Sequence, residues 1–178
     1  MSEELDKTKK PVPAILIVDD EEIVLVALRD TLVREGYTVV ASPHAVHALS
    51  VLKGQEFSVI ITDQQMPMVS GLEFLAQVRE IQPNATRILI TAVLNLGTLI
   101  EAINKAEIFR FVVKPWSREE LLACVKSAVE RFDAITSNVR ALKEAQERNQ
   151  ELATQNASLS EQVERLTTEN AALRPPPG

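Results

Sequence analysis

The sequence has 178 residues, of which 46% are hydrophobic and 25% are charged, and its formal net charge is -6. This length suits one domain with a full hydrophobic core plus an extension, and the composition excludes a disordered chain. The negative charge argues against general affinity for nucleic acids or anionic membranes, and no apolar run is long enough to span a bilayer. We therefore expect a cytoplasmic protein.

Strand-like and helix-like segments alternate along most of the chain. Residues 1–12 are polar and without periodicity, which predicts a flexible leader. Apolar runs typical of strands occupy 14–18, 37–41, 57–62, 87–91 and 108–113, and helical patterns occupy 23–35, 45–52, 72–81, 99–105 and the chain from 117 onward. Right-handed crossovers then predict an α/β fold with a doubly wound, five-stranded parallel sheet. The flavodoxin-like strand order 2-1-3-4-5 suits five strands best.

The single cysteine, Cys124, lies within the last helical pattern. Its apolar neighbours at helical spacing are Leu121, Leu122, Val125 and Val129. A thiol in such a pattern is expected in the protein core, and a lone cysteine is typical of a reducing compartment.

The last third of the chain has the pattern of one long helix. Neither Gly nor Pro occurs between Trp116 and Arg174, and residues 175–178 form a proline-rich tail. Every seventh residue is leucine at Leu152, Leu159, Leu166 and Leu173, and each is preceded at three residues by Asn149, Asn156, Val163 or Asn170. Farther back, the same phase gives Ile135 and Leu142 with Asn138 and Ala145. Leucine at d and asparagine at a predict a parallel, two-stranded coiled coil over 133–174, continuous with the preceding helix.

The alternative to a coiled coil is a single amphipathic helix packed on its own domain, which needs a wider apolar stripe than this one. Acidic and basic residues are mixed in the stretch before the leucines, as in Glu130, Arg131 and Asp133. Zipper proteins that bind DNA carry a basic region in this place. We therefore expect a homodimer that does not bind DNA directly.

Carboxylates stand at the ends of two predicted strands. Asp19 and Asp20 follow the run at 14–18, and Asp63 follows the run at 57–62. The carboxyl ends of parallel strands are where open α/β sheets bind ligands. Carboxylates gathered there repel one another unless a divalent cation or a proton intervenes. The sequence therefore predicts a metal site.

Two further polar residues, Thr91 and Lys114, stand at the ends of the fourth and fifth predicted strands. A carboxylate that accepts a phosphoryl group needs a cation to neutralise developing charge, a fixed positive side chain and a hydroxyl that holds an equatorial oxygen. Asp63, a bound metal, Lys114 and Thr91 supply that set.

In these motifs the chain resembles the receiver domains of bacterial two-component response regulators, including those of chemotaxis. The motifs are Asp19-Asp20-Glu21 after the first strand, Asp63-Gln64-Gln65-Met66-Pro67 with Gly71 after the third, Thr91-Ala92 after the fourth and Lys114-Pro115 after the fifth. The resemblance covers residues 13–132 and does not extend to the heptads.

The resemblance implies that Asp63 is the phosphoacceptor, which takes a phosphoryl group from a histidine kinase or phosphotransfer protein in a reaction that the receiver itself catalyses. It also implies that Mg²⁺ is bound directly by Asp20 and Asp63, through a water by Asp19, and by the backbone carbonyl of Gln65.

Further roles follow from the same resemblance. Thr91 and Lys114 would contact the phosphoryl oxygens, and Phe111 occupies the aromatic switch position. The peptide bond between Lys114 and Pro115 is expected to be cis. By contrast, we interpret Glu21 as a favourable charge in the first turn of a helix, and His44 and His47 as surface or packing residues.

Three functions fit these features. The first is a phosphorylation-controlled switch that signals through a dimeric coiled coil. The second is the front of a larger regulator, because residues 107–111 with Lys114-Pro115-Trp116 are similar to receivers that precede cyclic-dinucleotide enzymes or kinase domains. The third is a coiled-coil scaffold, although a pure scaffold has no need of clustered carboxylates.

Overall fold

The computed structural model describes residues 14–92, 97 and 106–172. The chain divides into two compact units, of which the first ends at Ile135 and the second begins at Thr136. The predicted leader, the predicted helix at 99–105 and the proline-rich tail lie outside the described residues. No helix in the described ranges is long and apolar enough to cross a membrane.

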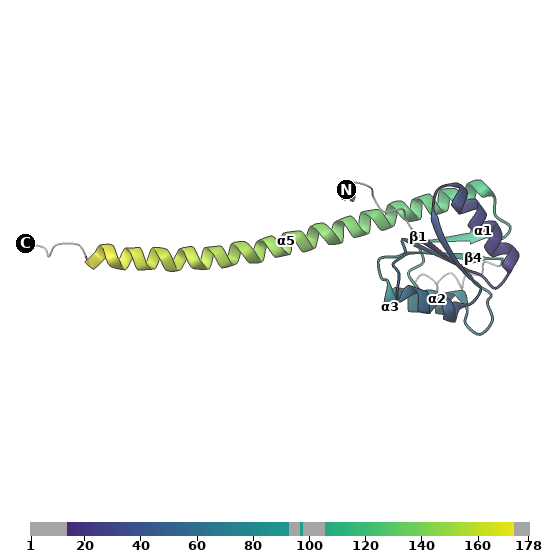
Figure 1. Cartoon of the computed structure of the whole chain (residues 1–178), viewed down its shortest axis with the longest axis horizontal. Coiled ribbons are helices and arrows are strands. Elements are labelled where there is room, and N and C mark those ends of the chain that lie inside the picture. Colours follow the sequence, from purple (N-terminus) through teal and green to yellow (C-terminus); the bar gives the residue numbers. More distant parts are fainter. Residues whose placement is uncertain (1–13, 93–96, 98–105, 173–178) are drawn as a thin grey trace, which may run out of the picture. The chain divides into compact units, whose positions relative to one another are not determined.

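The first unit contains one parallel sheet of five strands in the order β2-β1-β3-β4-β5 (Figure 1). The strands are β1 (Ala14–Val18), β2 (Thr38–Ser42), β3 (Val59–Asp63), β4 (Thr86–Thr91) and β5 (Arg110–Val113). β1, β3 and β4 are buried almost throughout, as their unbroken apolar runs predict for the centre of a parallel sheet. The predicted fold class and strand order are therefore confirmed.

Four helices are described: α1 (Glu22–Arg34), α2 (Ala45–Leu52), α3 (Gly71–Ile81) and α5 (Arg118–Ala172). Their starts agree with the predicted starts to within one residue. α3 begins with a capping box, in which the Ser70 hydroxyl accepts a hydrogen bond from the Glu73 N–H and the Glu73 carboxylate accepts one from the Ser70 N–H. This cap fixes the start of α3 directly after the loop that follows β3.

Apolar side chains alternate between the two faces of the sheet and form two core clusters. On β1, Leu16 and Val18 pack in the cluster that holds α2 and α3, whereas Ile15 and Ile17 pack in the cluster that holds α1 and the start of α5. Figure 1 shows α2 and α3 below the sheet and α1 on its other side. Since both faces are covered, functional side chains gather at the ends of the strands.

β5 begins two residues later than the sequence pattern predicts, at Arg110 and not at Ile108. Glu107 has a left-handed backbone with φ 46°, a conformation that interrupts an extended path. The apolar run at 108–113 therefore enters the strand from a turn, and only its last four residues form β5.

Cys124 lies in the core, as predicted, with 6% of its surface exposed. Burial raises the pKa of its thiol to about 11, so almost no thiolate is present at pH 8. We predict that iodoacetamide at pH 8 modifies native Cys124 at least about 100-fold more slowly than it modifies protein unfolded in guanidinium chloride. Equal rates in the two states would contradict the burial of this thiol.

Gly71, at the start of α3, lies against the end of β3. A Cβ atom at this position would overlap the backbone carbonyl oxygen of Asp63 and lie 2.9 Å from Leu89 Cδ1. We predict that Gly71→Ala lowers the free energy of unfolding by about 2 kcal/mol or more, because the overlap is with backbone. As a control, Gly54→Ala should change it by less than about 0.5 kcal/mol, since only Val51 O lies within 4 Å of the added atom. Urea unfolding of both variants measures the difference.

Candidate functional site

Two buried carboxylates meet at the carboxyl edge of the sheet. Asp19 directly follows β1 and is 1% exposed, and Asp63 is the last residue of β3 and is 4% exposed. β1 and β3 are neighbours, with Val18 paired to Thr62, so the register brings the two aspartates side by side. A buried charge is unfavourable unless another group compensates it.

Lys114 supplies the compensating charge. Its Nζ lies 2.6 Å from Asp63 Oδ1 and 3.2 Å from Asp19 Oδ2. The residue directly follows β5, and its N–H donates to the carbonyl of Thr91 at the end of β4. The bond between Lys114 and Pro115 is cis, which confirms that prediction. The edge strand thus brings the ammonium to both carboxylates.

The pKa values reflect this arrangement. Burial raises the pKa of Asp19, and the charge of Asp63 raises it further, while the hydrogen bond from Glu21 N–H and the charge of Lys114 oppose the rise. Burial alone would lower the pKa of Lys114, but its hydrogen bond to Asp63 and the charges of both aspartates raise it above the ordinary value. The ammonium therefore stays charged, and Asp19 takes up a proton more readily than an exposed aspartate does.

The remaining predicted residues surround this group. The second oxygen of Asp63, Oδ2, accepts a hydrogen bond from the N–H of Gln65. Asp63 pairs in register with Ile90, which places Thr91, 3% exposed, at the adjacent strand end. Phe111 is half-buried on β5 and packs against the α2 and α3 core cluster.

Asp20 differs from Asp19 and Asp63 in its exposure to solvent. Its side chain is exposed and lines an apolar groove of about 580 Å³ between the start of α2 and the loop after β3. His44 and His47 line the same groove and are exposed, and His47 Nδ1 lies 3.0 Å from Ser42 Oγ, which agrees with a surface role.

Glu21 contacts two residues of the site, which its position in the first turn of a helix does not predict. Its N–H donates to Asp19 Oδ1 at 2.9 Å, and its carboxylate lies 3.5 Å from Lys114 Nζ. The sequence signal for this role is the place of Glu21 in the acidic motif Asp19-Asp20-Glu21, whereas the pattern of helix charges predicts only a residue of the first helical turn. The local geometry instead makes Glu21 a neighbour of the site.

The donor atoms at this edge suit a hard cation. Within the described ranges, no three His, Cys, Asp or Glu side chains are arranged to hold a metal ion. Mg²⁺, however, keeps several waters and takes only one or two protein carboxylates. The buried carboxylates of Asp19 and Asp63 therefore fit Mg²⁺ in kind.

The site can be compared with known proteins. A family model described as the response regulator receiver domain matches residues 15–126. The hydrogenase transcriptional regulatory protein HoxA of Cupriavidus necator is 40% identical over 116 residues, which are 65% of this chain and 24% of that protein. Protein PetR of Rhodobacter capsulatus is 34% identical over 163 residues, which are 90% of this chain and 67% of PetR. The chain thus spans about a quarter of the length of the hydrogenase regulators that it matches.

Among solved structures, the signal receiver domain of an HD domain-containing protein from Pseudomonas fluorescens is similar, with a TM-score of 0.70 and 33% sequence identity. The similarity covers 73% of this chain and 96% of that one. The chain therefore belongs to the response regulator receiver family, and residues 15–126 form its receiver domain.

Proposed function

We propose that the protein is a phosphorylation-controlled switch in which Asp63 accepts a phosphoryl group from a histidine kinase or a phosphotransfer protein. The observation that carries this proposal is the contact of Lys114 Nζ with Asp63 Oδ1 at 2.6 Å, beside the second buried carboxylate of Asp19. An oxygen of Asp63 attacks the phosphorus of a phosphohistidine. The P–N bond breaks as the P–O bond forms, and the imidazole leaves.

The groups around Asp63 stabilise this transfer. The N–H of Gln65 holds one carboxylate oxygen, so the attacking oxygen has a fixed direction. Lys114 neutralises negative charge on the transferring group, and the hydroxyl of Thr91 holds one of its oxygens. Support for the role of Thr91 comes from its place next to Asp63 in the sheet register.

Mg²⁺ is the cofactor of this proposal. Asp20 and Asp63 would hold it directly, Asp19 would hold it through a water, and the backbone carbonyl of Gln65 would complete the protein ligands. When bound, the cation supplies neutralisation of the phosphoryl oxygens. Phe111 is the proposed reporter of phosphorylation, because it lies on the edge strand that also ends at Lys114.

We predict that the protein acquires one phosphoryl group from acetyl phosphate in the presence of Mg²⁺, and that Asp63→Asn or chelation of the metal reduces this labelling by at least about 100-fold. Intact-mass spectrometry measures the labelled fraction. The control is Asp30→Asn, an exposed aspartate on α1, which should label at the wild-type rate. Undiminished labelling of Asp63→Asn would refute the assignment of the phosphoacceptor.

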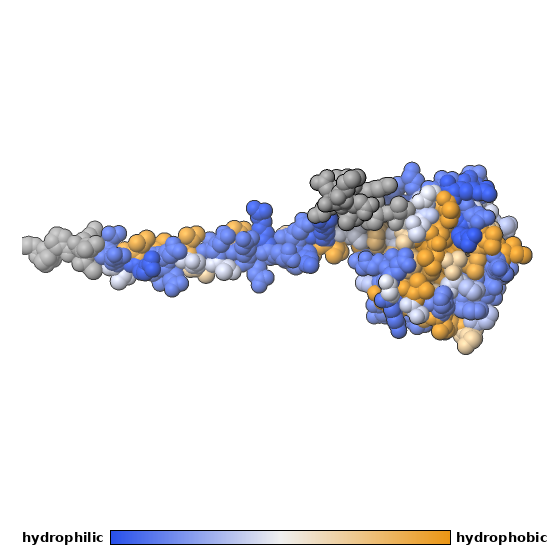
Figure 2. All heavy atoms as spheres, viewed as in Figure 1, coloured by the Kyte–Doolittle hydropathy of each residue, from blue (hydrophilic) through white to orange (hydrophobic). Residues whose placement is uncertain are grey.

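We further propose that residues 135–173 form a parallel, two-stranded coiled coil. Every described residue from Ser137 to Asn170 is exposed, including Leu152 at 48% and Leu159 at 56%. Figure 2 shows hydrophobic side chains at intervals along this part of the helix. An isolated helix with regularly exposed leucines is marginal in water, and burial against a second helix stabilises it. Leu173 lies outside the described residues.

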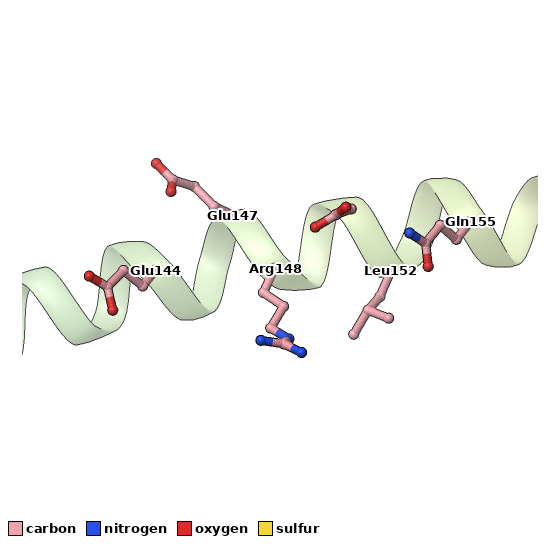
Figure 3. A pocket seen from close by; sticks show the side chains of 6 residues that line it. Glu144, Glu147, Arg148, Leu152 and Gln155 are labelled. Carbon is pink, nitrogen blue, oxygen red and sulfur yellow. The ribbon is translucent and has the colours of Figure 1, made fainter.

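In the proposed coiled coil, the side of the helix that carries the leucines forms the interface with the second helix. Figure 3 shows Leu152 and Arg148 on one side of the helix and Glu147 on the opposite side. Ion pairs such as Arg140 with Glu144 at 3.0 Å lie along the helix itself and support it locally. Asparagine at a positions favours two strands in one register at a cost in stability, so the proposed dimer is specific and weak.

We predict that sedimentation over a concentration series reveals a dimer, and that Leu159→Lys at a d position weakens association by at least about tenfold. The control is Thr154→Lys at an outward f position, which should leave association unchanged. A monomer at all concentrations would refute the dimer.

The same concentration series with phosphodonor tests whether phosphorylation is coupled to association. Identical association curves with and without phosphodonor would refute an influence of phosphorylation on the coiled coil.

A second candidate is that the receiver controls an output domain on a longer polypeptide. Two observations favour it: the chain spans 24% of the hydrogenase transcriptional regulators, and a similar structure is the receiver of an HD domain-containing protein. An antibody against the receiver would distinguish the candidates. A polypeptide much larger than 19.7 kDa in the source cells supports the second, and one of that size supports the first.

A further inference from the structure

A buried arginine lies at the opposite end of the sheet from Asp63. Arg87 is the second residue of β4 and is only 4% exposed. The neighbouring β4 residues Ile88, Leu89 and Ile90 are apolar and fully buried. A guanidinium among such residues is unfavourable unless its donors are hydrogen-bonded. The hydrogen-bond acceptors of the guanidinium therefore explain why an arginine occupies this buried position.

The guanidinium joins two connections of the chain. Its Nη1 donates to the carbonyls of Ala85 at 2.9 Å and Pro83 at 3.2 Å, in the connection that enters β4. Its Nε donates to the carbonyl of Ala106 at 2.8 Å, in the connection that enters β5. The backbone carbonyl of Arg87 also accepts the N–H of Phe109 at 2.8 Å. One residue thus fixes the entry to β5 through both its side chain and its backbone.

Glu107 completes the arrangement. Its carboxylate lies 2.9 Å from Arg79 Nη2 on α3 and 3.4 Å from Arg87 Nη2. The left-handed backbone of Glu107, with φ 46°, is unfavourable for a residue with a side chain. Contacts with the two arginines hold the turn in this conformation directly before β5.

The register of β5 matters because the strand is short and lies at the edge of the sheet. It has four residues and pairs with β4, with Ile88 opposite Arg110 and Thr91 opposite Val113. A shift of one residue in such a strand turns every side chain to the other face. Lys114 is the residue after β5, so a register shift at the entry to β5 would displace the Lys114 ammonium.

We propose that Arg87 is a positioning residue, which fixes the register of β5 from the far end of the sheet and so holds Lys114 Nζ against Asp63. The four steps along β4 from Arg87 to Thr91 span about 13 Å at 3.3 Å per residue, so Arg87 acts through the strand and does not touch the site. This inference rests on the proposed function, in which Lys114 assists phosphoryl transfer to Asp63.

The test compares variants by their rate of phosphorylation at saturating acetyl phosphate and Mg²⁺. Arg87→Met keeps an unbranched side chain as far as the position of Nε and removes all the donors. Arg87→Lys keeps the charge but lacks the guanidinium fork that bonds to both connections. Leu32→Ala is the matched control, because it also removes a buried side chain but lies on α1. α1 packs against β2, which is the edge strand on the opposite side of the sheet from β5. Circular dichroism selects a temperature at which every variant is folded.

We expect both Arg87 variants to be phosphorylated about 10- to 100-fold more slowly than the wild type, and Leu32→Ala to retain a rate within about twofold. A wild-type rate in Arg87→Met, or in Arg87→Lys, would overturn the proposal. A decrease of the same size in Leu32→Ala would also overturn it, because the effect would then follow general destabilisation.

A double-mutant cycle tests whether Arg87 acts through Lys114. If it does, adding Arg87→Met to Lys114→Met lowers the rate by less than about twofold, whereas independent effects would multiply. Equal decreases in the two backgrounds would refute the coupling. Failure of the proposed function is recognised separately, as a wild-type protein that is not phosphorylated or a Lys114→Met variant that reacts at the wild-type rate.

Hydrogen exchange gives a readout without phosphorylation. The N–H groups of Phe109 and Lys114 bond to β4 and report the entry and exit of β5. Arg87→Met should accelerate exchange in a peptide covering residues 106–114 by about tenfold and leave the peptide of β1 unchanged. Unchanged exchange at 106–114, or equal acceleration in β1, would overturn the positioning role.

Discussion

The contact of the Lys114 ammonium with the buried carboxylates of Asp19 and Asp63 is the interaction on which the site depends. Three strands end at this point, and each contributes a charge that would be costly to bury alone. Because the ammonium lies among the carboxylates, the strand ends can approach one another without repulsion. The same arrangement places the Lys114 ammonium 2.6 Å from Asp63 Oδ1, where in the proposed function it would neutralise charge on an incoming phosphoryl group.

The sheet makes this convergence possible. Alternate residues of each strand pack on opposite faces, so α1 and the start of α5 cover one face, α2 and α3 cover the other, and the polar groups are left at the carboxyl edge. Gly71 shows how close the packing is there, since even a methyl group would overlap the carbonyl of Asp63. The start of α3 and the end of β3 therefore behave as one unit, and the cap at Ser70 fixes where that unit begins.

Much of this could be predicted from the sequence, because unbroken apolar runs give strands and parallel strands place their last residues along one edge. That reasoning brought Asp19, Asp63 and Lys114 together. It did not find Arg87 or the late start of β5, because both depend on contacts between residues about twenty positions apart, such as Arg87 with Ala106. The hydrophobic periodicity of a sequence predicts which face of a strand or helix a residue occupies. It does not predict which distant carbonyl a buried guanidinium will contact.

The two ends of β5 have different kinds of anchors. At the end near Asp63, Lys114 makes contacts that a phosphoryl group or a cation would compete for, so this end has reason to rearrange during the proposed cycle. At the other end, Arg87 and Glu107 make contacts that no ligand of the site reaches. In the proposed switch, contacts at the entry to β5 would keep the register of the strand while its exit rearranges. Phe111 lies between the two ends, so in the proposed switch it is placed to respond to a displacement of Lys114 while the entry to β5 keeps its register.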